Sequence, residues 1–177
     1  IINGWRNKRL NGGIIYDLVE DRIIVSELSM PHSPRWHQNK LWILEAGSGY
    51  FGYIEGNQFI KKTFIPGFTR GLTFVNDKYA VICSSQDRHD NSFNNLELHQ
   101  SLINSNTTSK CGVFIVDLMT FNIITHMVFN KGPIELYDVV SIPNATRTRL
   151  IDMDDTLIQT FNKLGTVNTS QMVIEIQ

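Results

Sequence analysis

The sequence predicts an all-β fold of β-propeller blades, each a four-stranded antiparallel meander, and two internal repeats carry this prediction. Residues 32–46 (HSPRWHQNKLWILEA) match residues 70–84 (RGLTFVNDKYAVICS), with apolar and turn residues in the same places. Residues 12–28 match residues 112–128 in the same way. Each repeat has the pattern strand, tight polar turn, strand. Four short strands recurring about every 40 residues are typical of propeller blades, and a β-sandwich or another meander is the alternative.

The two kinds of hairpin alternate along the chain. If the strands of a blade are called a to d, the repeat at 32–46 is an a–b hairpin and the repeat at 12–28 is a c–d hairpin. Their β-branched and aromatic residues suit strands, and no segment has the spacing and caps of an amphipathic helix. The expected hairpins are, in order, c–d at 12–28, a–b at 33–46, c–d at 50–65, a–b at 71–84, c–d at 111–129, a–b at 136–142 with 149–153, and c–d within 157–176.

The first hairpin is a c–d hairpin, so the chain begins in the middle of a blade. With the hairpins that follow, it holds about three and a half blades. Closed propellers have about four to eight blades, and open sheet edges pair readily with other chains. We therefore expect residues 1–177 to form one propeller segment, with 144–177 as the least regular blade. The remaining blades would come from sequence before Ile1 or from another chain, and the absence of methionine at position 1 favours the former.

Several strings of residues in the same order resemble one family. They are MPHSPRW at 30–36, LWIL at 41–44, PGFTRGL at 66–72, VDL at 116–118 and ELYDV at 135–139. Together they are similar to DUF4915, a family of uncharacterised bacterial proteins, over about residues 4–143. The resemblance implies a propeller-like fold, and it implies that the chain is the C-terminal portion of a longer protein. It implies no activity.

Blade topology predicts where functional side chains meet. Strands a begin at one end of a propeller, around the central axis, so His32, Arg70 and the pair Tyr137–Asp138 are expected at one mouth. The long polar insertion at 85–110 joins strands b and c and belongs to the same end, where long loops are often functional. The candidate ligand-binding residues are His32, Arg35, Arg70, Arg88, His89, Tyr137 and Asp138. The catalytic candidates are His32, Glu135 and Asp138, and His32 is the candidate metal ligand.

Each candidate also has a structural interpretation. His32 stands between two prolines and could bond only to the backbone of a turn. The arginines could join neighbouring blades, with Asp138 and Glu135 as their partners, and the insertion could be a loop without a role. Trp36 and Trp42 are expected in the core between blades, and Asp17 and Asp117 are expected to close turns.

Three functions fit this pattern. A binding module would hold a small polar or anionic ligand, such as a sugar or a carboxylate, on the arginines and Tyr137. A propeller enzyme of the lactonase, lyase or hydrolase type would use His32 as a base with an acid and Arg70, with a divalent metal left open as cofactor. A scaffold would present its surface to protein partners. We favour the binding module.

Composition excludes other classes. The net charge is −1 with scattered basic residues, which argues against nucleic acid as a partner. No apolar run is long enough for a membrane span, so we expect no membrane partner. We also expect a soluble chain, cytoplasmic rather than secreted. Cys83 and Cys111 match no zinc or redox spacing and are expected to be buried thiols, or a disulfide in an oxidising compartment.

Overall fold

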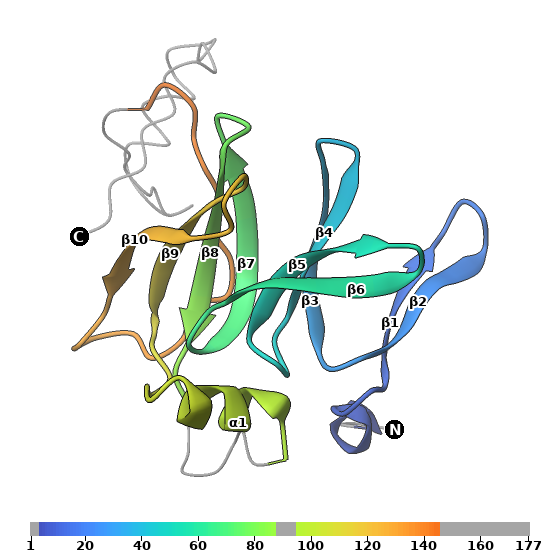
Figure 1. The fold of residues 1–177 in the computed structure, drawn as a ribbon, viewed down its shortest axis with the longest axis horizontal. Coiled ribbons are helices and arrows are strands. Elements are labelled where there is room, and N and C mark those ends of the chain that lie inside the picture. Colours follow the sequence, from blue (N-terminus) through green and yellow to red (C-terminus); the bar gives the residue numbers. More distant parts are fainter. Residues whose placement is uncertain (1–3, 88–94, 146–177) are drawn as a thin grey trace, which may run out of the picture. The chain divides into compact units, whose positions relative to one another are not determined.

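The computed structural model describes residues 4–87 and 95–145 (Figure 1). The chain divides into two compact units, Ile1–Ser141 and Ile142–Gln177, and every helix and strand described below belongs to the first. The elements are η1 (Gly4–Lys8), β1 (Gly13–Asp17), β2 (Arg22–Leu28), β3 (Pro31–His37), β4 (Lys40–Glu45), β5 (Tyr50–Glu55), β6 (Gln58–Phe64), β7 (Phe68–Val75), β8 (Tyr79–Ser85), α1 (Glu97–Asn104), β9 (Gly112–Asp117) and β10 (Ile123–Val128).

The strands form two four-stranded antiparallel meanders and one two-stranded sheet. One meander has the order β3-β4-β5-β6, the other β7-β8-β9-β10, and β1 pairs with β2. The all-β class and the four-stranded meanders are therefore confirmed, as are the first five predicted hairpins. Each meander begins with the predicted strand a, and β1–β2 is the predicted c–d hairpin that precedes them.

Local turn chemistry explains the hairpins. The carboxylate of Asp17 accepts hydrogen bonds from the backbone amides of Val19 and Glu20 at 2.9 and 3.1 Å. Asp117 closes the equivalent turn of the β9–β10 hairpin by the same bonds. These bonds stabilise the charged carboxylates and lower the pKa of both aspartates. The turn residues Gly56 and Asn57 both have positive φ, as a tight two-residue hairpin turn requires.

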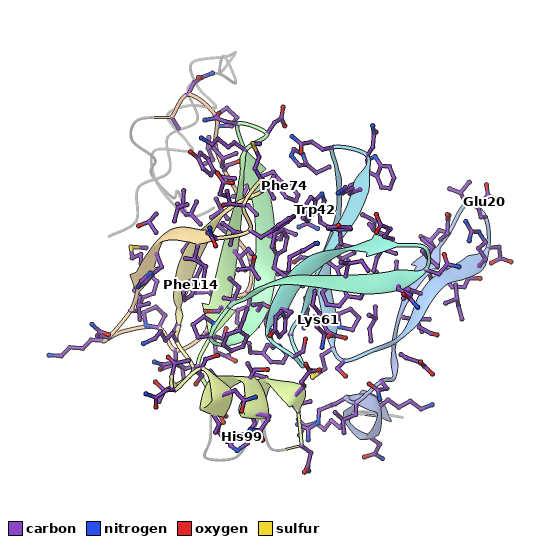
Figure 2. All side chains as sticks on the ribbon, viewed as in Figure 1. Glu20, Trp42, Lys61, Phe74, His99 and Phe114 are labelled. Carbon is purple, nitrogen blue, oxygen red and sulfur yellow. The ribbon has the colours of Figure 1, made fainter. Side chains whose placement is uncertain are left out.

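The larger core lies between the two meanders. Trp42 of β4 is 2% exposed and packs against Phe51 of its own sheet at 5.1 Å and Phe74 of β7 at 5.8 Å, measured between ring centres (Figure 2). The expectation that Trp36 shares this core is wrong, because Trp36 is 71% exposed. The two tryptophans differ because β3 bulges between His32 and Arg35, which shifts the alternation of its two faces.

A second apolar cluster covers the opposite face of the β3–β6 sheet. Val25 and Leu28 of β2 pack there with Ile43 of β4. The β3–β6 sheet is thus covered on one face by the hairpin that precedes it in the chain and on the other by the sheet that follows it.

The insertion at 85–110 contains a helix that the sequence did not predict. In α1, Leu98 and Leu102 are buried and pack with Ala46 and Phe68. Two buried leucines four residues apart are too short a pattern to identify a helix. In addition, the residue before α1 is Leu96, whose side chain makes no capping hydrogen bond.

The strand predicted at 136–142 is also wrong, because these residues form no strand. Their backbone amides donate hydrogen bonds to side chains instead of to the backbone of a neighbouring strand. The amide of Leu136 donates to Ser85 Oγ at 3.0 Å, and the amide of Val139 donates to the Asp138 carboxylate at 2.9 Å. The predicted strands at 149–153 and within 157–176 lie outside the described residues. In the described part of the chain, no helix is long and apolar enough to cross a membrane.

Candidate functional site

The two predicted strands a, β3 and β7, lie alongside each other. At their beginnings, the imidazole of His32 meets the ring of Phe68 edge-on at 5.6 Å, and Ser33 Oγ donates a hydrogen bond to the carbonyl oxygen of Arg70. Toward their ends, His37 stacks on Phe74 at 4.0 Å. The beginnings of both strands therefore meet at one end of the sheets.

Arg70 is the central residue of this end. Its guanidinium carbon lies 5.4 Å from the centre of the Phe68 ring and 4.6 Å from that of Tyr137, so two aromatic rings hold it in place. Its Nε is buried and has no hydrogen-bond partner within the described residues. A buried donor without an acceptor costs about 1–3 kcal/mol.

His32 is partly buried beside Arg70. Burial and the nearby guanidinium charge lower the pKa of His32, so the imidazole is neutral at neutral pH. Among residues 4–87 and 95–145, the ion pairs and hydrogen bonds join His32 to neither Glu135 nor Asp138. A histidine that acts as a general base is usually oriented by such a partner.

Two acids and a second arginine complete the surroundings of Arg70. The hydroxyl of Tyr137 donates to Glu135 Oε2 at 3.0 Å. Arg35 Nη2 lies 3.9 Å from Asp138 Oδ2, with 44% and 67% of the two side chains exposed. An exposed pair at this distance contributes little to stability. We call His32, Arg35, Phe68, Arg70, Tyr137 and Asp138 the Arg70 site.

The segment that carries Tyr137 and Asp138 is held against β7 and β8. The amide of Gln86 donates to the carbonyl of Ile134 at 2.8 Å, and Ser85 Oγ bonds to Leu136. Gly71 permits this approach, because a Cβ at that position would lie 2.6 Å from the Asp138 backbone. Five of the seven predicted ligand residues thus belong to the Arg70 site. The other two, Arg88 and His89, lie outside the described residues.

A divalent metal finds no ligand set in this part of the chain. Among the residues that the structure describes, no three His, Cys, Asp or Glu side chains gather as they would around a metal ion. The two cysteines are free and buried, as predicted, and Cys83 Sγ accepts a hydrogen bond from the amide of Gly71 at 3.1 Å. Burial raises the pKa of both thiols.

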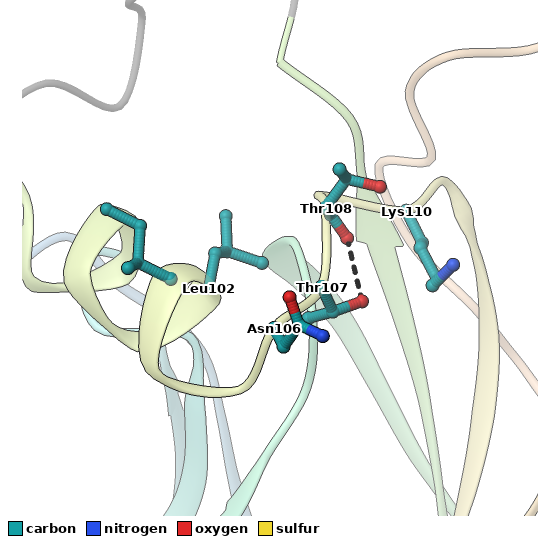
Figure 3. A pocket seen from close by; sticks show the side chains of 6 residues that line it. Leu102, Asn106, Thr107, Thr108 and Lys110 are labelled. Atoms are coloured by element: carbon teal, nitrogen blue, oxygen red, sulfur yellow. Dashed lines mark hydrogen bonds between the residues drawn. The ribbon is translucent and has the colours of Figure 1, made fainter.

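An open hollow of about 520 Å³ lies beside the end of α1 (Figure 3). Its polar groups satisfy one another in part, since Thr107 Oγ1 bonds to the carbonyl of Thr108. It is lined by Leu102, Ile103, Asn106, Thr107, Thr108 and Lys110. All six belong to the 85–110 insertion, although none of them was an individual candidate for a site.

Sequence reasoning also missed a buried polar cluster around Glu45. This carboxylate is 6% exposed and accepts hydrogen bonds from the Ser29 amide at 3.0 Å and from Ser48 Oγ at 2.6 Å. Lys61 Nζ lies 3.6 Å from it and 2.6 Å from Glu97 of α1. All partners are satisfied, so the cluster joins β4, β6 and α1 rather than forming a ligand site.

Comparison with known proteins identifies a family but no function. The family model described as a domain of unknown function, DUF4915, matches residues 1–151. No curated protein matches the chain.

Proposed function

The chain belongs to the DUF4915 family, and from this premise we propose that it is a β-propeller protein that binds a small ligand through an anionic group at Arg70. One observation carries the proposal. The Nε of Arg70 is buried without an acceptor among the described residues, while two aromatic rings fix the guanidinium. A carboxylate that approaches the Nε edge would receive two parallel hydrogen bonds and satisfy this donor.

The contacts around His32 favour binding over catalysis. A general base needs a neighbour that orients it, and the charge that acts on His32 is the cation of Arg70. A neutral imidazole beside a guanidinium can donate or accept one hydrogen bond to a ligand without a proton transfer. A site that has arginine and aromatic side chains but no oriented base is typical of binding rather than catalysis.

The arrangement of the sheets supports the propeller part of the proposal. Each meander follows the chain order a to d, and each sheet packs on its neighbours in sequence. Successive strands a lie side by side, as they do around a propeller axis. A structure of the complete protein in which β3, β7 and residues 136–141 do not surround one axis would overturn this part.

Titration with simple anions tests the binding proposal. Acetate, succinate and inorganic phosphate are titrated calorimetrically into the protein and into the variants Arg70→Met and Arg22→Met, the latter an exposed arginine of β2. We expect a carboxylate to bind the protein and the Arg22→Met variant, and to bind Arg70→Met at least about tenfold more weakly, since hydrogen bonds to a charged group contribute about 1.5–3 kcal/mol.

A folded state of each variant is confirmed by circular dichroism. If Arg70→Met does not fold, Arg70→Lys serves in its place, because lysine keeps the charge but lacks the Nε donor and the planar fork. Equal carboxylate affinity in the folded Arg70 variant would refute the proposal.

A further inference from the structure

The charges around Arg70 identify the ligand more closely, an inference that rests on the proposed function. Four ionisable side chains of both signs gather here: the cations Arg35 and Arg70 and the acids Glu135 and Asp138. A purely anionic ligand would meet the carboxylates as well as the guanidinium groups, and like charges at short distance oppose binding. A ligand with both charges would find an opposite charge at each end.

Asp138 has a carboxylate oxygen that can accept a hydrogen bond from a ligand cation. Its Oδ1 accepts a hydrogen bond from the Val139 amide at 2.9 Å. Its Oδ2 lies 3.9 Å from Arg35 Nη2, which is longer than the roughly 2.7–2.9 Å of a charge-assisted hydrogen bond. The Asp138 side chain is 67% exposed, so a ligand cation can reach Oδ2 without displacing a strong bond.

The acid lies close to the arginine. Gly71, the residue after Arg70, has so little space that a Cβ there would lie 2.6 Å from the Asp138 Cα. Tyr137, the residue before Asp138, covers the Arg70 guanidinium. A donor for carboxylate and an acceptor for ammonium thus come from residues next to backbone positions that lie close together, and the Tyr137 ring contacts the donor.

We propose that the ligand of the Arg70 site is a small zwitterion that carries a carboxylate and an ammonium group a few bonds apart, the chemistry of an α-amino acid. The carboxylate binds the Nε edge of Arg70. The ammonium binds Asp138 Oδ2, and the carbon body lies along the exposed ring of Tyr137. Each charged end of the ligand replaces water with an oppositely charged partner.

Pairs of probes that differ only in the amino group test this proposal. Alanine and propionate, glutamate and glutarate, and phenylalanine and 3-phenylpropionate are titrated into the protein and into Asp138→Asn, Arg35→Gln and Arg70→Met. We expect at least one amino acid to bind about tenfold or more tightly than its deaminated partner. Asp138→Asn should abolish this preference and Arg70→Met should weaken both members of the pair.

The Arg35→Gln variant separates a ligand contact from a structural role. It removes the same 3.9 Å ion pair as Asp138→Asn but keeps the acceptor for ammonium, so any change in affinity should be shared by both members of a probe pair, and the ratio between their affinities should be retained. If carboxylates bind at Arg70 and the amino group adds nothing, the zwitterion is wrong and the proposed function stands. If no probe binds, or if the probes bind Arg70→Met unchanged, the proposed function fails as well.

Discussion

The guanidinium of Arg70 lies 4.6 Å from the ring centre of Tyr137, and this contact joins β7 to a segment that follows it only after three more strands and the helix. The segment is held by Ser85 and by the close approach of Asp138 to Gly71. The Arg70 site therefore depends on residues 134–141 staying against β7.

Replacement of Gly71 by alanine should displace this segment. The new Cβ would lie about 2.5 Å from the Val139 nitrogen, and backbone cannot yield as a flexible side chain does. Overpacking of this kind costs about 1–3 kcal/mol. We expect Gly71→Ala to lower the free energy of unfolding in urea by that amount and to weaken the binding of carboxylate probes.

Gly56→Ala is the matched control. Gly56 has φ of +54°, and a Cβ added there would meet no atom within 4 Å, so alanine strains the backbone of a remote turn without touching the site. It should lower stability and leave probe affinity unchanged. Equal probe affinity in both variants would show that the 134–141 segment does not form a wall of the site.

The hairpins could be predicted because their determinants are local. Short windows of sequence show the alternation of apolar residues. They also show the turn residues, such as the Asp17 that closes the first turn. That His32 and Arg70 lie at the same end of neighbouring strands could be predicted for the same reason, since it follows from the order of the hairpins.

The features that were missed depend on distant partners. Residues 136–142 bond to Ser85 rather than to a strand, and Glu45 is satisfied by groups from three other segments. Trp36 was misplaced because a bulge in β3 changes which residues face the core, and bulges leave no reliable trace in a single sequence. In α1 the decisive signal is packing of Leu98, which no local pattern reveals.

Trp42 should be the most costly core residue to truncate. It is almost fully buried, contacts aromatic rings of both sheets, and donates its indole N–H to the carbonyl of His37 at 2.9 Å. Trp42→Ala should lower the free energy of unfolding by about 3–5 kcal/mol. Trp36→Ala, at an exposed position of the neighbouring strand, should change it by less than about 0.5 kcal/mol. Similar losses in urea melts of the two variants would contradict the assigned core.

Glu45 tests whether the buried polar cluster is structural. In Glu45→Gln an amide NH₂ faces the donors Ser29 or Ser48, and Lys61 loses its buried partner. We expect a loss of about 1–3 kcal/mol in the free energy of unfolding. Glu97→Gln removes only the exposed partner of Lys61, so its loss should stay below about 1 kcal/mol. Neither variant should alter probe affinity at Arg70, and a large change in affinity would show that the cluster belongs to the site.

His32 should make stability depend on pH below neutrality. Burial and the Arg70 charge lower the pKa of His32 in the folded protein, whereas in the unfolded chain it is about 6.5. The unfolded state therefore binds more protons between these two values. Stability is complete above about pH 6.5 and decreases as the pH falls through the folded-state pKa.

Urea melts at several pH values from about 7.5 to 5 measure this dependence. The His32→Gln variant should lose less stability on acidification than the unaltered protein, because a group that favours proton uptake on unfolding has been removed. An unchanged acid dependence in His32→Gln would mean that His32 is neither buried beside Arg70 nor able to sense its charge, and the close approach of β3 to β7 would then be wrong.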